Sequence, residues 1–286
     1  MDMKQLIVVS LQIAIIGTVF GFGLRSTFGD VLYVWRHPSL LVRSLLAVLV
    51  IMPMLVVAFF KAVDLRMDIK VVLIALALSP VPPLLPNKVN KAGGHASFGL
   101  GLLLVLAIGA IAAIPLSVAA LNLVTERPVA IEPGGIARIV VMTVLVPLLV
   151  GMTVHRLAPR VAEALDTPVR WIATGLLLVG AVMLLFGIRH AVWAAIGGGA
   201  IAAIVAFVAV GLVVGHLMGG PEPENSTVLA LATACRHPAI ALTVASANFP
   251  DEQFGGMVIL YLLVSAVAAI PYVKWQGRRA SVAVAA

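Results

Sequence analysis

The segment "VVLIALALSPVPPLLPNKVNKAGG", residues 71–94, decides how this chain folds. Its first half is apolar enough for a membrane helix, yet it is followed by four prolines at positions 80, 82, 83 and 86. Proline removes a backbone donor and clashes with the preceding helical turn. The segment is therefore predicted to be a broken helix.

A second apolar span is interrupted in the same way. Residues 231–246 read "LATACRHPAIALTVAS", with Arg236 and His237 directly before Pro238. The two broken spans occupy matching places in two halves of the chain, because each is followed by one further span within its own half. Interrupted segments in corresponding positions indicate an inverted-repeat transporter whose site lies near the bilayer midplane.

The composition indicates an integral membrane protein. The 286 residues are 62% hydrophobic and 11% charged, with a mean hydropathy of +1.14, whereas soluble domains carry roughly 45–50% apolar and about 25% charged residues. The net charge of +7 arises from Lys and Arg in predicted short loops, so we expect a lipid bilayer and no nucleic acid as partner. The single cysteine, Cys235, excludes an internal disulfide.

Apolar runs bounded by charged residues predict an all-α polytopic membrane protein of about nine transmembrane helices. Each run must be helical because unpaired amides cost several kcal/mol in lipid. With boundaries uncertain by about two to four residues, the helices are expected at about 5–24, 39–60, 69–91, 96–122, 136–155, 169–188, 191–218, 225–249 and 254–273.

The distribution of basic residues predicts the orientation. With the N-terminus outside, eleven Lys and Arg fall on the inner side and seven on the outer side. Inner loops carry the excess of basic residues, so we expect the C-terminus in the cytoplasm and the protein in a bacterial inner membrane. The sequence does not indicate an oligomeric state.

All twelve acidic residues are predicted to lie in loops or termini, so no span is expected to contain a carboxylate. Intramembrane carboxylates serve proton relays and cation binding, and their absence favours an anionic substrate. No catalytic or nucleotide-binding motif is present either. The chain is predicted not to be an enzyme and to use no cofactor or metal.

Arg236 lies in the middle of its predicted span and Lys88 lies in the broken part of residues 69–91, whereas Arg43 and Lys91 lie near span ends and are expected to reach the interface. A charge at the bilayer centre costs about 2.5–3.5 kcal/mol on insertion scales. Two interpretations stay open: the Lys88 and Arg236 side chains cap the carbonyl ends of half-helices, where the dipole is negative, or they attract an anionic substrate. His237 is either a packed, hydrogen-bonded residue or a substrate or proton contact.

Several motifs, taken in order, resemble the bile acid:sodium symporter family of secondary transporters. Residues 17–53, "GTVFGFGLRSTFGDVLYVWRHPSLLVRSLLAVLVIMP", match its G-x-G-L and "IMP" features, and residues 145–159, "LVPLLVGMTVHRLAP", match a P-x-x-x-G-x-x-x-[HR] helix. The broken spans, "ALALSPVPPLLPNKV" and "LALATACRHPAIALTVASANF", stand where the family has its two crossing broken helices.

The resemblance implies a single transporter domain built from two inverted repeats, residues 1–124 with four helices and residues 133–286 with five. It implies a panel and a core domain. The panel helices would lie at about 5–24, 136–155 and 169–188, and the core helices at about 39–122 and 191–273.

The chain departs from the family at its sodium ligands. The family's acidic residue in the second broken helix falls on Ala232, its Gln-Asn pair falls on Arg236 and His237, and a glutamine before "IMP" falls on Val48. Hard cations need several oxygen ligands. We therefore expect Lys88 and Arg236 to replace the bound cations, and transport to be independent of sodium. Facilitated diffusion, anion exchange and proton coupling through His237 or Lys88 all stay open.

The sequence thus predicts a secondary transporter of a small organic anion, a carboxylate, working by alternating access of core against panel. The alternative is a non-transporting membrane sensor or partner subunit of the same fold. Candidate substrate-binding residues are Asn87, Lys88, Arg236, His237, Ser79, Thr233 and Asn248, and the helix breaks are assigned to Pro82, Pro83, Pro86 and Pro238.

Overall fold

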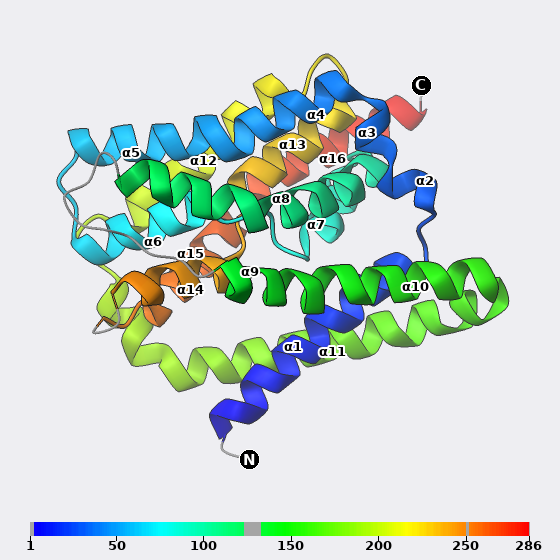
Figure 1. Ribbon diagram of the computed structural model, residues 1–286, viewed down its shortest axis with the longest axis horizontal. Helices are drawn as coiled ribbons and strands as arrows, with labels where there is room; N and C mark the ends of the chain where they lie inside the picture. Colours follow the sequence, from blue (N-terminus) through cyan, green and yellow to red (C-terminus); the bar gives the residue numbers. More distant parts are fainter. Residues whose placement is uncertain (1–2, 123–132, 250–251, 286) are drawn as a thin grey trace.

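The computed structural model describes residues 3–122, 133–249 and 252–285, and this part of the chain is helical and without strands (Figure 1). In chain order the helices are α1 (Met3–Gly23), α2 (Phe28–Val31), α3 (Tyr33–Arg36), α4 (Pro38–Leu45), η1 (Leu46–Ile51), α5 (Met52–Ala62), α6 (Met67–Leu78), α7 (Leu85–Lys91), α8 (Ala96–Asn122), α9 (Pro133–Val140), η2 (Val141–Leu145), α10 (Val146–Leu157), α11 (Pro159–Ala195), α12 (Ala200–Met218), α13 (Pro223–Ala234), α14 (Pro238–Asn248), α15 (Gly255–Ala268) and α16 (Ile270–Ala285). The two η elements are π-helical.

Eight helical segments among the described residues are long and apolar enough to cross a bilayer. They correspond to eight of the predicted spans. The remaining predicted span, 69–91, is divided into α6 and α7 by a linker that contains Pro82 and Pro83. The all-α, polytopic architecture is confirmed, whereas nine crossings and the inverted repeats stay predictions.

The predicted boundaries around α11 are wrong. The helix begins at Pro159, because proline suits the first helical turn, and it ends at Ala195. The next helix begins at Ala200, after Gly197–Gly199, which all have positive φ and so interrupt the helix. The break expected near residue 188 is present as a kink, since Ile188 has the non-helical angles φ −116° and ψ 16°.

The expectation that every acidic residue lies in a loop is also wrong. Asp30, Asp68, Glu163, Asp166 and Glu224 lie in helices, three of them in a first turn, where the positive end of the helix dipole favours a carboxylate. Glu163 and Asp166 belong to a membrane-length helix, near its N-terminal end. Asp2, Glu126, Glu132 and Asp251 lie outside the described residues.

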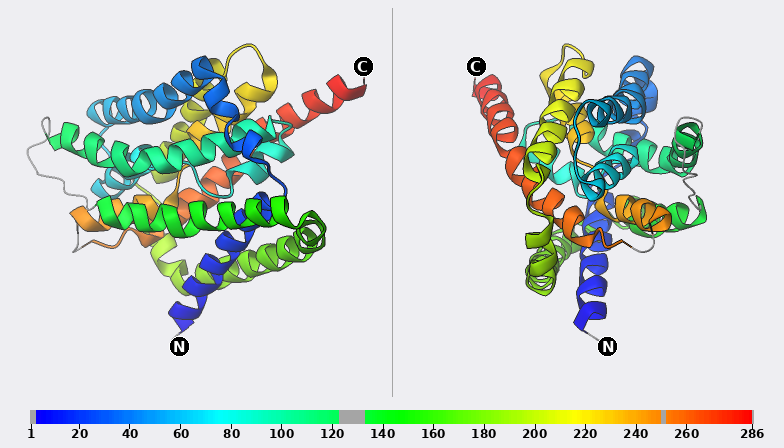
Figure 2. Two further views of the ribbon diagram at one scale, coloured as in Figure 1. Left: turned by 45° about the vertical axis from the view of Figure 1, so that its right-hand side comes forward. Right: turned by 90° about the vertical axis from the view of Figure 1, so that its left-hand side faces the viewer.

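The helices form two groups by their contacts; in Figures 1 and 2, α1 and α11 lie lowest, α4, α5 and α12 lie highest, and α9, α10 and α14 lie between them. We call α1, α10 and α11 up to residue 187 the first layer, and α2 to α8 with α12 to α16 the second layer. Helix α9 and η2 contact α8 of the second layer and continue into α10 of the first. The main apolar core lies in the second layer, and a small cluster of Val19, Phe22, Leu100, Leu148 and Met152 joins the two.

The first layer is held by a close backbone approach. A Cβ atom on Gly23 of α1 would lie 2.9 Å from the Cα of Gly151 of α10, and the same holds in reverse. One turn further along α10, His155 Nδ1 donates to the Leu24 carbonyl oxygen at 2.8 Å. The glycine and histidine of the P-x-x-x-G-x-x-x-H motif therefore both secure the end of α1.

Gly151→Ala is expected to lower stability by about 1–3 kcal/mol, because the added methyl group would overlap the α1 backbone. The measurement is the thermal unfolding of the purified protein in detergent. Gly109→Ala in α8 is the matched control, since a Cβ there meets no atom within 4 Å. Equal melting temperatures for the two variants would contradict this account of the helix contact.

Candidate functional site

The two broken spans meet directly. Helix α6 ends at Leu78 and α13 ends at Ala234, and the backbone amide of His237 donates to the Pro80 carbonyl at 2.8 Å and to Ser79 Oγ at 3.1 Å. We call this meeting point the crossover. It brings the C-terminal ends of two half-helices together, and both ends present carbonyl oxygens without intrahelical donors.

Arg236 occupies the crossover. Its side chain donates from Nε to the Thr233 carbonyl at 3.0 Å, from Nη1 to the Ser79 carbonyl at 3.1 Å and from Nη2 to the Val48 carbonyl at 3.0 Å. The residue is 1% exposed. One guanidinium thus caps α13, α6 and the π-helical segment η1 together, the contact that the capping interpretation anticipates.

The Val48 carbonyl is free to accept this bond because of a proline. In η1 the amide of Met52 donates to the Ala47 carbonyl, five residues back. The same i to i+5 pattern would assign Pro53 to Val48, and proline has no N–H. The "IMP" sequence therefore leaves one carbonyl inside the span for the guanidinium.

Tyr261 of α15 completes the crossover. Its hydroxyl oxygen accepts from the Arg236 backbone amide at 2.9 Å, and its O–H donates to the Ala234 carbonyl at 3.2 Å. The side chain is 1% exposed. Sequence reasoning missed Tyr261 and the Val48 carbonyl; the proline five residues after Val48 is a signal that could have revealed the second.

His237 is the N-cap of α14, and its ring has one unused donor. Its Nδ1 accepts from the Ile240 amide at 3.4 Å as a side-chain N-cap, which in the neutral ring leaves the proton on Nε2. Nε2 is buried and has no hydrogen-bond partner in the described structure. A buried donor without an acceptor costs free energy, so a ligand acceptor at this atom would be stabilising.

Lys88 reaches the crossover from α7. Its Nζ lies 3.3 Å from Sγ of Cys235, the residue before Arg236, and its side chain is partly buried. Asn87 is exposed beside it, and Pro86 is buried in the first turn of α7. The structure therefore places the Lys88 ammonium beside the residue that precedes Arg236 in the chain.

The remaining candidates are arranged less uniformly. Ser79 and Thr233 are fully buried, and their hydroxyls donate to the Leu76 and Leu229 carbonyls of their own helices. Asn248 is the last residue of α14, at the end opposite the crossover, and its amide donates to the Val244 carbonyl. Pro238 is in the first turn of α14.

The described residues hold no carboxylate partner for Arg236. Their three ion pairs, Arg25–Asp166, Arg66–Asp68 and Lys70–Asp64, involve none of the crossover residues. In the same part of the chain, no group of three or more His, Cys, Asp or Glu residues could hold a metal ion. The positive charge of the crossover is thus balanced by carbonyl dipoles.

Comparison with known families agrees with this architecture. Residues 12–196 match the model of the Sodium Bile acid symporter family, and the chain belongs to that family. Together with its membrane-length helices, this makes it a membrane transporter of the bile acid symporter kind. No curated protein sequence matches the chain. The matched region contains α6 and α7 and ends before the Arg236 segment.

Arg236→Met is expected to lower stability by about 3–5 kcal/mol, because three buried carbonyls lose their donor. Thermal unfolding in detergent measures the loss. The control is Arg189→Met, which removes an exposed arginine bonded to a single carbonyl of its own helix and should change stability by no more than about 0.5 kcal/mol. Similar melting temperatures for both variants would refute the capping role.

Proposed function

We propose that the chain is a secondary transporter of a small organic anion bearing a carboxylate, and that it is not coupled to sodium. The observation that carries this proposal is the Arg236 guanidinium on the Thr233, Ser79 and Val48 carbonyls. By the family resemblance, Arg236 and Val48 stand where sodium-coupled relatives hold glutamine ligands. The charge that sodium would bring is here attached to the protein.

Lys88 has a related role in this proposal. It contributes a second fixed cation within reach of Cys235, one residue from Arg236. Two basic side chains without a carboxylate partner repel a cationic substrate and favour an anionic one. If transport were coupled to protons, the proton would have to bind to a group other than a carboxylate, because the described residues of the crossover form no ion pair with one.

His237 is assigned to the substrate carboxylate. Its Nε2–H is buried and unpaired, and its ring is held by the N-cap bond from the Ile240 amide. Exposed Asn87 and partly buried Lys88 lie on the adjoining α7 and would contribute polar contacts. Ser79, Thr233 and Asn248 stay weaker candidates, because their side chains already bond carbonyls of their own helices.

The proposed movement is alternating access of a core against a panel. In this proposal the panel contains α1, the continuous helix formed by α9, η2 and α10, and α11 up to residue 187, while the core contains the second layer with the crossover. The same proposal includes two inverted repeats, residues 1–124 and 133–286. It also places the protein in a bacterial inner membrane with its N-terminus outside.

A sensor or partner subunit is the second candidate. The three carbonyls that accept hydrogen bonds from Arg236 favour this candidate, because a crossover held by a permanent cap would not change its conformation during a transport cycle. Flux separates the two candidates. Purified protein in proteoliposomes should accumulate or exchange a labelled carboxylate if it transports, and should only bind it if it senses.

Uptake is expected to be unchanged when choline replaces sodium, since Arg236 already supplies the charge at the crossover. The assay uses proteoliposomes with a labelled bile acid and a labelled 2-keto acid, against liposomes without protein. Strict dependence on sodium would refute the proposed replacement of the ion. Sodium-independent binding without any flux would favour the sensor.

His237→Asn is expected to weaken carboxylate binding by about 10- to 100-fold, the loss of a hydrogen bond to a charged group. Asparagine is an excellent N-cap, so the bond from the Ile240 amide can be retained while Nε2–H is removed. Apparent affinity and melting temperature are measured together. Thr243→Val, on the exposed side of α14, is the control. Unchanged affinity would remove His237 from the site.

A further inference from the structure

Helix α16 gives the end of the described chain a strongly basic segment. Its sequence, "IPYVKWQGRRASVAVA", contains Lys274, Arg278 and Arg279 and no acidic residue. These cations lie at the end of the last membrane-length helical segment, Gly255–Ser281. In both views of Figure 2 the last turns of α16, coloured red, lie at the edge of the molecule. The basic segment is thus placed where a helix leaves the bilayer.

One face of α16 is fixed to the second layer. Gln276 is 2% exposed, and its Nε2 donates to Thr227 Oγ1 of α13 at 2.8 Å. A Cβ on Gly277 would lie 3.2 Å from the Lys91 carbonyl oxygen of α7. Helix α13 ends at the crossover, and α7 carries Lys88. This face of α16 therefore packs on two of the helices that build the crossover.

The outward face of α16 carries four exposed residues that we call the basic stripe, Lys274, Trp275, Arg278 and Arg279. At 3.6 residues per turn these positions cover an arc of about 140°. Trp275 is 46% exposed, and the guanidinium carbon of Arg279 lies 4.9 Å from the centre of its ring. This cation–π contact holds a charge beside the indole. Lys91, also exposed, follows where α7 contacts α16.

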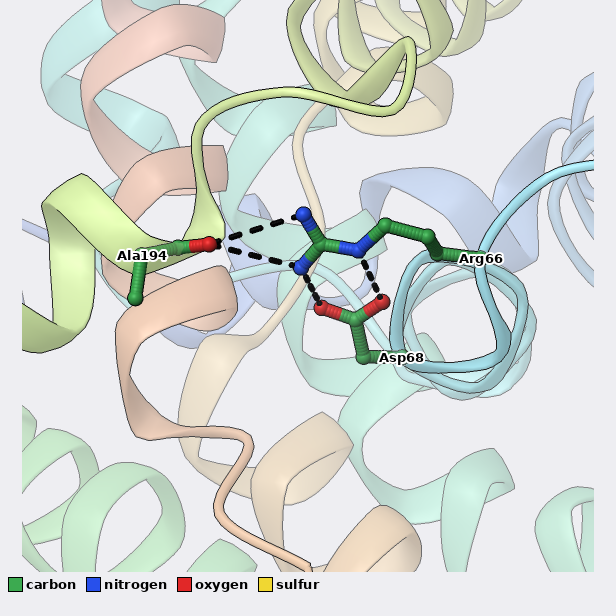
Figure 3. Close-up of polar contacts among 3 residues, drawn as sticks. All are labelled: Arg66, Asp68 and Ala194. Carbon is green, nitrogen blue, oxygen red and sulfur yellow. Dashed lines mark hydrogen bonds and ion pairs between the residues drawn. The ribbon is translucent and has the colours of Figure 1, made fainter.

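The charges of the basic stripe have no carboxylate partner among the described residues. Arg66, the N-cap residue of α6, shows the contrasting arrangement. Its Nε donates to Asp68 at 3.1 Å, and both of its Nη atoms lie 3.5 Å from the Ala194 carbonyl oxygen (Figure 3). The guanidinium of Arg66 is thus used within the protein, whereas the stripe presents its cations to a partner outside the chain.

We propose that the basic stripe binds the phosphate of an anionic phospholipid such as phosphatidylglycerol. Basic residues directly beyond a membrane-spanning helix attract anionic headgroups. An acidic protein segment would match the charges, but an indole ring at the end of a membrane span is typical of the lipid–water interface. Because α16 is also bound to α7 and α13, the lipid would stabilise the second layer. The proposal does not depend on transport.

The test titrates the purified protein in neutral detergent with phosphatidylglycerol or phosphatidylcholine, and native mass spectrometry measures the bound lipid. Phosphatidylglycerol is expected to bind more tightly and to raise the melting temperature. A triple variant, Lys274→Gln with Arg278→Gln and Arg279→Gln, should weaken phosphatidylglycerol binding by about 10- to 100-fold. It should leave phosphatidylcholine binding unchanged, and it should lose the rise in melting temperature.

The matched control is the triple variant Lys61→Gln, Arg138→Gln and Arg189→Gln. These residues are also one lysine and two arginines, and all three are exposed. Both triple variants therefore lose the same charge, but only one loses it from the stripe. If either triple variant unfolds in detergent, the single charge reversals Arg278→Glu and Arg138→Glu repeat the comparison.

Equal weakening of phosphatidylglycerol binding by the stripe variant and its control would overturn the proposal, because net charge alone would then explain it. Equal affinity of the parent protein for the two lipids would also overturn it. Displacement of the lipid by inorganic phosphate at constant ionic strength would assign the stripe to a soluble anion instead. Lipid binding that depends on the stripe, in a protein that carries no carboxylate, supports this site and contradicts only the proposed function.

Discussion

The structure depends on one constraint: a carbonyl group away from water must find a donor. Breaking two helices at the crossover exposes the last carbonyls of α6 and α13, and the π-helical segment η1 adds a third at Val48. Arg236 meets all three with a planar group that has five N–H donors. A lysine ammonium has three donors at one point and could not span three separate elements in the same way.

Much of this arrangement could be predicted from the sequence, because prolines and charges are costly in lipid and so are informative. The printed residues predict the interruption of both spans, around Pro82 and Pro83 and before Pro238, and they predict the family. Tyr261 could not be predicted, because a tyrosine in an apolar helix is compatible with many environments. The start of α11 could not be predicted, because the charged residues Arg160, Glu163 and Asp166 are as typical of a loop as of a helix end outside the membrane.

The family motif in α10 also acquires a physical meaning. Gly151 permits the backbone of α1 to approach, and His155 closes the end of that helix through the Leu24 carbonyl. Both residues act on the first layer, away from the crossover. The matched residues 12–196 include Val48, Ser79 and Lys88 of the crossover, whereas the segment that carries Arg236 lies beyond them.

A cation that is part of the polypeptide does not leave with the substrate. In the proposed cycle, the Arg236 guanidinium stays at the crossover, so each carboxylate crosses the bilayer with its negative charge uncompensated. Moving one elementary charge through the membrane potential is worth about 2.3 kcal/mol per 100 mV. In a cell with a negative interior this voltage drives anions outward, so the proposed cycle would favour export of the carboxylate over its uptake.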